Sequence, residues 1–111
     1  MNAKRFFDTV AGHQEKGASE IMMRLNCGQP FGVRYHGQRI DCVVLLCVLK
    51  DLMNDNDDGN ICISFENAAD GTIRDINIEV CADSHNYGMC VDGVDFIGGG
   101  ILISVRETSV G

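Results

Sequence analysis

The sequence predicts a mainly β protein of the α+β class, with an N-terminal helix or helix pair over residues 1–28 and a β sheet over 31–105. Apolar residues recur at helical spacing near the N-terminus, whereas several later segments alternate apolar and polar residues. A third observation is the uninterrupted apolar run of eight residues from Cys42 to Leu49. We expect a strongly bent five-stranded antiparallel sheet, or a small open barrel, built around that run.

The chain of 111 residues is the size of one domain, and we expect a single domain over 1–111. Hydrophobic residues make up 45% and charged residues 23%, which is ordinary for a globular protein. The first residues hold no apolar signal segment, and no apolar run approaches the ~20 residues that span a bilayer. We therefore expect a cytoplasmic protein without a membrane partner, in which the six cysteines are reduced.

Residues 3–11 predict a helix, because Phe6, Phe7 and Val10 recur at helical spacing. A second helical stretch follows over 19–28, with Ser19 as a candidate cap. Its apolar stripe consists of Ile21, Met22 and Leu25. The glycines at positions 12 and 17 each cost ~1 kcal/mol relative to alanine inside a helix. One kinked helix and two short helices therefore fit the pattern equally well.

Alternation of apolar and polar residues predicts four strands, at 31–36, 60–66, 73–81 and 91–105. The dipeptide His36-Gly37 is a turn candidate after the first of them. The triple glycine at 98–100 either shifts the register as a bulge or turns the chain back as a hairpin.

The segment 38–53 is interpreted as the long central strand, buried on both faces, because β-branched residues are frequent in it. A helix capped by Asp41 is the alternative, since periodicity cannot separate helix from strand in a uniformly apolar run.

The acidic loop after the central segment suggests a calcium site, because an EF-hand loop needs Asp or Asn ligands and a glycine at position six. Placing Gly59 at that position puts Phe65 where the bidentate glutamate is required. We therefore interpret the loop as a solvated turn. Its candidate ligand or interaction residues are Asn54, Asp55, Asp57 and Asp58.

A second candidate site combines Cys81, Asp83, His85 and Cys90, whose thiolate, carboxylate and imidazole groups are zinc ligands. No C-x-x-C pair accompanies them, so Cys81 can equally be the last residue of its strand. Cysteine catalysis by Cys90 with His85 is a weaker interpretation, because nothing nearby supplies an evident oxyanion hole.

The order of elements over about residues 20–105 resembles the small bent barrel of the Sm-like (Lsm) proteins. Three fragments are similar to family motifs: Val33-Arg34-Tyr35-His36-Gly37, Asp51-Leu52-Met53-Asn54 and Val91-Asp92-Gly93. The resemblance implies assembly into rings by strand-edge pairing, and binding of uridine-rich RNA through the Asn and Arg of the motifs. Asp92 stands here in place of that arginine, so we carry over the ring and not the RNA.

Charge divides the chain into unlike halves. Residues 1–50 carry seven Lys/Arg against four Asp/Glu, a net +3, and residues 51–111 carry two against twelve, a net −10. The acidic half repels phosphate backbones, which disfavours nucleic acid as a partner. Unlike halves favour head-to-tail association, in which the basic half of one copy meets the acidic half of the next.

We therefore expect a non-enzymatic, homo-oligomeric binding or scaffolding module that uses no cofactor. One alternative is a small metal-dependent or small-molecule enzyme with its site in the loop 81–90. Another is an acidic inhibitor or immunity-type protein that binds a basic partner through its C-terminal half.

The mass of the protein in solution at moderate and high salt tests the expected self-association. An assembly held by unlike charges has a mass several times 12.1 kDa at moderate salt and dissociates when salt screens those charges. A strict monomer at both salt concentrations contradicts the expectation.

Overall fold

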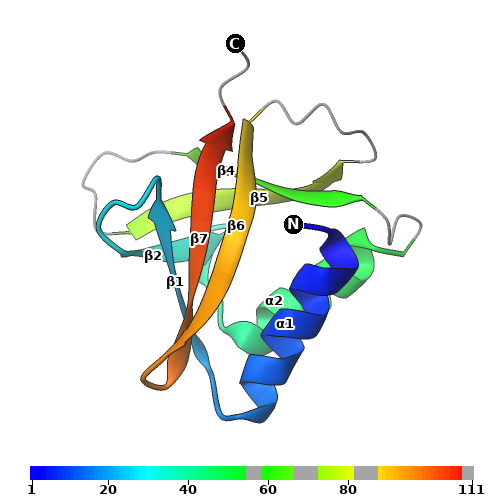
Figure 1. The fold of residues 1–111 in the computed structure, drawn as a ribbon, viewed down its shortest axis with the longest axis vertical. Helices are drawn as coiled ribbons and strands as arrows, with labels where there is room; N and C mark the ends of the chain where they lie inside the picture. The colour runs from blue at the N-terminus through cyan, green and yellow to red at the C-terminus, as the bar shows by residue number, and fades with distance from the viewer. Residues whose placement is uncertain (55–58, 67–72, 82–87, 109–111) are drawn as a thin grey trace.

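The computed structural model describes residues 1–54, 59–66, 73–81 and 88–108, and these form two helices and a seven-stranded mixed sheet (Figure 1). The elements in chain order are α1 (Ala3–Glu15), β1 (Glu20–Leu25), β2 (Phe31–Tyr35), β3 (Gln38–Arg39), α2 (Cys42–Leu52), β4 (Asn60–Glu66), β5 (Ile73–Cys81), β6 (Gly88–Ile97) and β7 (Gly100–Thr108). The predicted α+β class and the N-terminal helix are confirmed.

The strands pair in the order β1-β7-β6-β4-β5-β2-β3, and β1 also pairs with β2. This additional pairing closes a ring of hydrogen bonds through six strands, with β3 attached to β2. β1 is parallel to β7 and β2 is parallel to β5, whereas the other pairs are antiparallel. The prediction of a five-stranded antiparallel sheet is therefore wrong.

The ring is not the predicted Sm-like barrel. β1, β7 and β6 form one group of strands, and β4, β5 and β2 form a second group that runs across the first (Figure 1). In the part of the chain that the structure describes, two residue pairs join β4 to β6 and two join β1 to β2. The sheet therefore consists of two groups that meet at two short corners.

Helix α1 begins at Asn2, whose side-chain oxygen accepts a hydrogen bond from the Arg5 amide at 3.2 Å. Its buried residues are Ala3, Phe6 and Val10, which lie on one face at i, i+3 and i+7. The sequence predicted this helix and its apolar stripe correctly, and the helix continues through Gly12 to Glu15.

The predicted second helix at 19–28 is wrong, because residues 20–25 form strand β1. The apolar residues of this short segment fit two patterns. Ile21, Met22 and Leu25 form a helical stripe, whereas Ile21, Met23 and Leu25 alternate as in a strand. Pairing decides between them, since β1 pairs with β7 along its full length. Tertiary hydrogen bonding overrides the local preference here.

The predicted long central strand is also wrong, because the apolar run forms helix α2. Asp41 is its N-cap, and its side chain accepts a hydrogen bond from the Val44 amide at 2.9 Å. The buried residues Cys42, Leu45 and Leu49 recur at i, i+3 and i+7, and α2 packs on α1 (Figure 1). The run belongs to the core as predicted, but the side chain of Val43 remains 55% exposed, so the helix buries only one face.

The two predicted turns are hairpins. His36 and Gly37 have φ of 51° and 77°, so both adopt the left-handed conformation that a tight turn between β2 and β3 requires. The glycine triplet turns β6 back onto β7, which confirms the hairpin alternative, and Gly99 has φ of 89°. The register shift lies earlier, between Val91 and Gly93.

Alanine substitutions in α2 test which face the core requires. Leu49→Ala removes a fully buried side chain and should lower the free energy of unfolding by about 2–5 kcal/mol. The control Val44→Ala changes a side chain that is 42% exposed and should stay within about 0.5 kcal/mol of the wild type. Equal losses, measured by chemical denaturation, would indicate a segment buried on both faces.

Candidate ligand-binding site

The acidic-loop candidates lie mostly outside the described residues. Asp55, Asp57 and Asp58 are outside them, and Asn54 is an exposed turn residue that follows Met53, the C-cap of α2. Its amide donates a hydrogen bond to the Asp51 carbonyl at 3.4 Å. The interaction site predicted here stays a prediction.

The zinc candidates are also only partly described. Asp83 and His85 lie outside the described residues, Cys81 ends β5, and Cys90 lies on β6 opposite Cys62 of β4. Among the residues that the structure does describe, no group of three or more His, Cys, Asp or Glu side chains could hold a metal ion. The two alternative functions, which depend on the loop 81–90 and on the acidic residues, stay predictions.

A cavity of about 500 Å³ lies where three segments of the chain meet, and we call it the junction pocket. β1 and β3 both pair with the same edge of β2, β1 near its start and β3 near its end. The two segments separate between these points and meet again where Glu20 pairs with Asp41. The residues that line the pocket are Glu20, Ile21, Met22, Gly32, Val33, Arg39, Ile40, Asp41 and Ile73.

The register explains why the pocket has an apolar floor and a charged rim. The three pairings that enclose it are Met22–Gly32, Arg34–Arg39 and Glu20–Asp41. Along the chain, a single residue separates one pairing from the next. These residues are Ile21 on β1, Val33 on β2 and Ile40 after β3, and all three are buried. Side chains alternate between the faces of a strand, so their neighbours Glu20, Arg39 and Asp41 are exposed at the opening.

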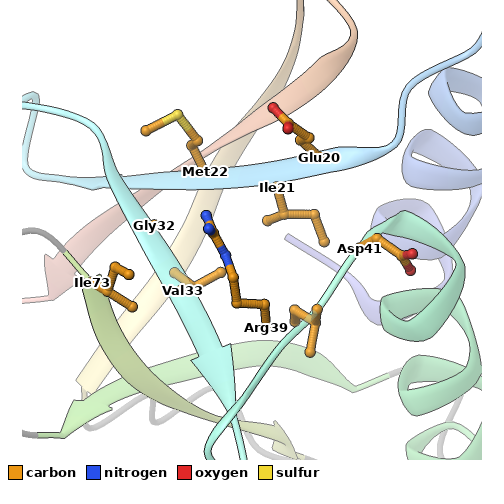
Figure 2. Close-up of a pocket in the computed structure, with 9 residues that line it drawn as sticks. Glu20, Ile21, Met22, Gly32, Val33, Arg39, Asp41 and Ile73 are labelled. Atoms are coloured by element: carbon orange, nitrogen blue, oxygen red, sulfur yellow. The ribbon is translucent and has the colours of Figure 1, made fainter.

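Arg39 supplies the positive charge of the pocket. Its guanidinium points into the space between β1 and β2, close to Gly32 (Figure 2). Within the described part of the chain, the side chain of Arg39 makes no hydrogen bond, ion pair or ring contact. Nearby arginines differ in this respect: Arg34 pairs with Asp75 at 3.2 Å between Nε and Oδ1, and Arg74 lies over the Phe31 ring at 4.4 Å.

The two carboxylates at the rim do not neutralise Arg39. The Asp41 carboxylate points towards α2, where it caps the helix, and the Glu20 carboxylate points away from the guanidinium (Figure 2). Arg39 is therefore available to an anion from outside the protein.

Close packing holds the junction in place. The Cys42 amide donates a hydrogen bond to the Ser19 carbonyl at 2.9 Å, next to the Glu20–Asp41 pairing. On the other side of β1, a Cβ atom on Gly100 would lie 2.6 Å from the Glu20 carbonyl oxygen, so this close approach requires glycine. The opening of the pocket is consequently fixed by backbone contacts on both sides of Glu20.

Sequence reasoning missed this site. Ile21 comes from a segment that was interpreted as a helix, and Arg39 and Ile40 come from one that was interpreted as a long strand, so Ile21 was not expected beside the other two. A lone arginine beside a turn is no signal by itself. Only the pairings of β1 and β3 with β2 bring these residues together.

Comparison with known proteins finds no match: no protein-family model, no curated protein and no solved structure matches the chain. Within the described residues, no helix is long and apolar enough to cross a membrane. The resemblance to the Sm-like proteins therefore gains no support beyond the sequence fragments.

The thiol of Cys42, at the edge of the junction, predicts a pH dependence of stability. Burial raises the pKa of this thiol above its usual value of 9.0, and the neighbouring Asp41 carboxylate raises it further. Above about pH 9 the unfolded chain loses the proton that the folded protein retains, so this contribution to stability is complete below that pH and is lost as pH rises through the folded pKa.

The free energy of unfolding, measured by chemical denaturation, should fall between neutral pH and pH values above about 9. This fall should be smaller in Cys42→Ala than in the wild type. Cys47→Ala, on the exposed face of the same helix, is the control and should keep the wild-type slope. Parallel curves for wild type and Cys42→Ala would show that Cys42 does not contribute.

Proposed function

We propose that the protein is a non-enzymatic binding module, and that its junction pocket holds a small monocarboxylate with an apolar body. The observation that supports this most directly is Arg39, a cation directed into the pocket without a partner among the described residues. An arginine guanidinium presents parallel N–H donors that match the two oxygens of a carboxylate.

The pocket has the size and lining of a small-molecule site. Ligand cavities commonly measure about 300–1,000 Å³ and combine an apolar surface with a few polar groups, and the junction pocket measures about 500 Å³. Ile21, Val33 and Ile40 would cover the apolar body of the ligand, which gains ~25 cal/mol per Å² of apolar surface removed from water.

The charges at the rim favour a ligand with a single negative charge. One guanidinium balances one carboxylate, whereas Glu20 and Asp41 at the opening repel a more highly charged anion such as a phosphate. Binding is favoured over proton-transfer chemistry because arginine stays protonated and exchanges no proton at ordinary pH.

Self-association remains part of the proposal. The charge division of the chain supports it, and so do the large apolar side chains that stay exposed, Val43 and Val44 on α2 and Phe96 and Ile97 at the β6–β7 turn. The salt-dependent mass tests this part independently of the pocket.

Arg39→Met tests the ligand proposal because it removes the charge and keeps an apolar side chain of similar length. Hexanoate should shift the backbone amide resonances of Gly32, Val33 and Ile40 in NMR titrations of the wild type. Loss of a charged hydrogen bond worth about 1.5–3 kcal/mol should weaken this binding at least about tenfold in the variant.

Two controls accompany the titration. Arg5→Met removes an equal charge from the exposed face of α1 and should bind hexanoate like the wild type. Hexanamide has the same apolar body without the charge and should bind the wild type as weakly as hexanoate binds Arg39→Met. Equal hexanoate affinity in the wild type and Arg39→Met would overturn the proposal.

A further inference from the structure

Cys62 of β4 and Cys90 of β6 lie directly opposite each other at one of the two corners of the sheet. We propose that these two thiols form a reversible disulfide when a small-molecule disulfide such as oxidised glutathione is present. The inference is independent of the junction pocket, which lies at the other corner of the sheet, where β1 meets β2.

Alternation along the strands places both thiols on the face opposite the main core. Cys62 lies between Ile61 and Ile63, which are 0% and 1% exposed and belong to the main core cluster, whereas Cys62 is 9% exposed and lies outside that cluster. Cys90 directly precedes Val91, another core residue. Opposed residues of an antiparallel pair share a face, so the two side chains leave the sheet in the same direction.

The strand pairing also sets the distance between the two backbones. Directly opposed residues in an antiparallel pair have Cα atoms about 4.5–5.5 Å apart. A disulfide spans Cα distances of about 4.4–6.8 Å. The register therefore brings the two cysteines within bonding range without movement of either strand.

The reaction is balanced by two thiol–disulfide exchanges. Cys90 is the more exposed thiol, and its thiolate attacks one sulfur of glutathione disulfide, which releases one glutathione thiolate. The Cys62 thiolate then attacks the Cys90 sulfur of the mixed disulfide and releases the second glutathione. Both cysteines are oxidised and glutathione disulfide is reduced, and the two protons lost by the protein thiols are taken up, through the solvent, by the two glutathione thiolates.

A charged neighbour favours the first exchange. Arg106 lies opposite Cys90 on β7, so it shares the face of the thiol, and its side chain is exposed. The positive charge of Arg106 attracts the carboxylates of glutathione disulfide, which brings the disulfide close to the Cys90 sulfur.

The bond would strengthen a weak point of the fold. Among the described residues, two pairs hold β4 against β6, Cys62–Cys90 and Ile63–Met89. A covalent link here ties the two groups of strands together and closes the chain between residues 62 and 90, which restricts the unfolded state. The oxidised protein should therefore have a thermal unfolding midpoint higher by on the order of 10 °C.

The test incubates the folded wild-type protein with excess glutathione disulfide, blocks the remaining thiols and maps the linked peptides by mass spectrometry. The expected product is a single chain without intermolecular disulfides that has lost two hydrogens and contains the Cys62–Cys90 peptide pair. Dithiothreitol should reverse both the link and the rise in the unfolding midpoint. Protein unfolded in denaturant should instead give mixed pairings among the six cysteines.

Variants separate this link from other thiol reactions. Cys62→Ser should stop at a glutathione adduct on Cys90, whereas Cys27→Ser and Cys47→Ser change exposed cysteines and should leave the link intact. A link between Cys81 and either thiol, intermolecular bonds through Cys27 or Cys47 alone, or a stable glutathione adduct on wild-type Cys90 would each overturn the proposal.

Discussion

The fold depends on the placement of β1 between two partners. Six residue pairs join it in parallel to β7, and on its other side it pairs with β2 and, through Glu20, with Asp41. The glycine at position 100 allows the start of β7 to approach Glu20 closely enough for this arrangement. Without β1, the two groups of strands would be joined at one corner only, and the junction pocket would lose one of its three walls.

The same pairings determine the chemistry of the pocket. A single residue separates each of the three enclosing pairings from the next. Side chains alternate along a strand, so Ile21, Val33 and Ile40 point inward and the charged residues remain at the opening. Asp41 is used twice, once in the pairing with Glu20 and once as the cap of α2. The cap engages its carboxylate, and this leaves the charge of Arg39 to an external group.

Local patterns predicted much of the secondary structure but not the partners of the strands. β2, β4 and β5 were placed nearly residue by residue, because their alternation reflects one buried face each. The errors fall on β1 and α2, where a short stripe and a uniformly apolar run fit both periods. The junction pocket was not predicted, because its β1 wall lies on a misassigned segment and correct assignment of β2 and β5 does not by itself show that a cavity lies beside them. Cys90 was considered as a ligand of zinc, but the residue opposite it on β4 is Cys62, which only the strand register reveals.

The sequence by itself determined the class of the protein, the N-terminal helix, the turn at His36 and Gly37, and the place of the apolar run in the core. These features depend on interactions between neighbours along the chain and on the number of apolar side chains to be buried. Only the tertiary structure decided that β1 is a strand, that α2 is a helix with one buried face, and that Arg39 projects into a pocket. Each of these depends on hydrogen bonds or packing between distant segments, which local sequence patterns do not encode.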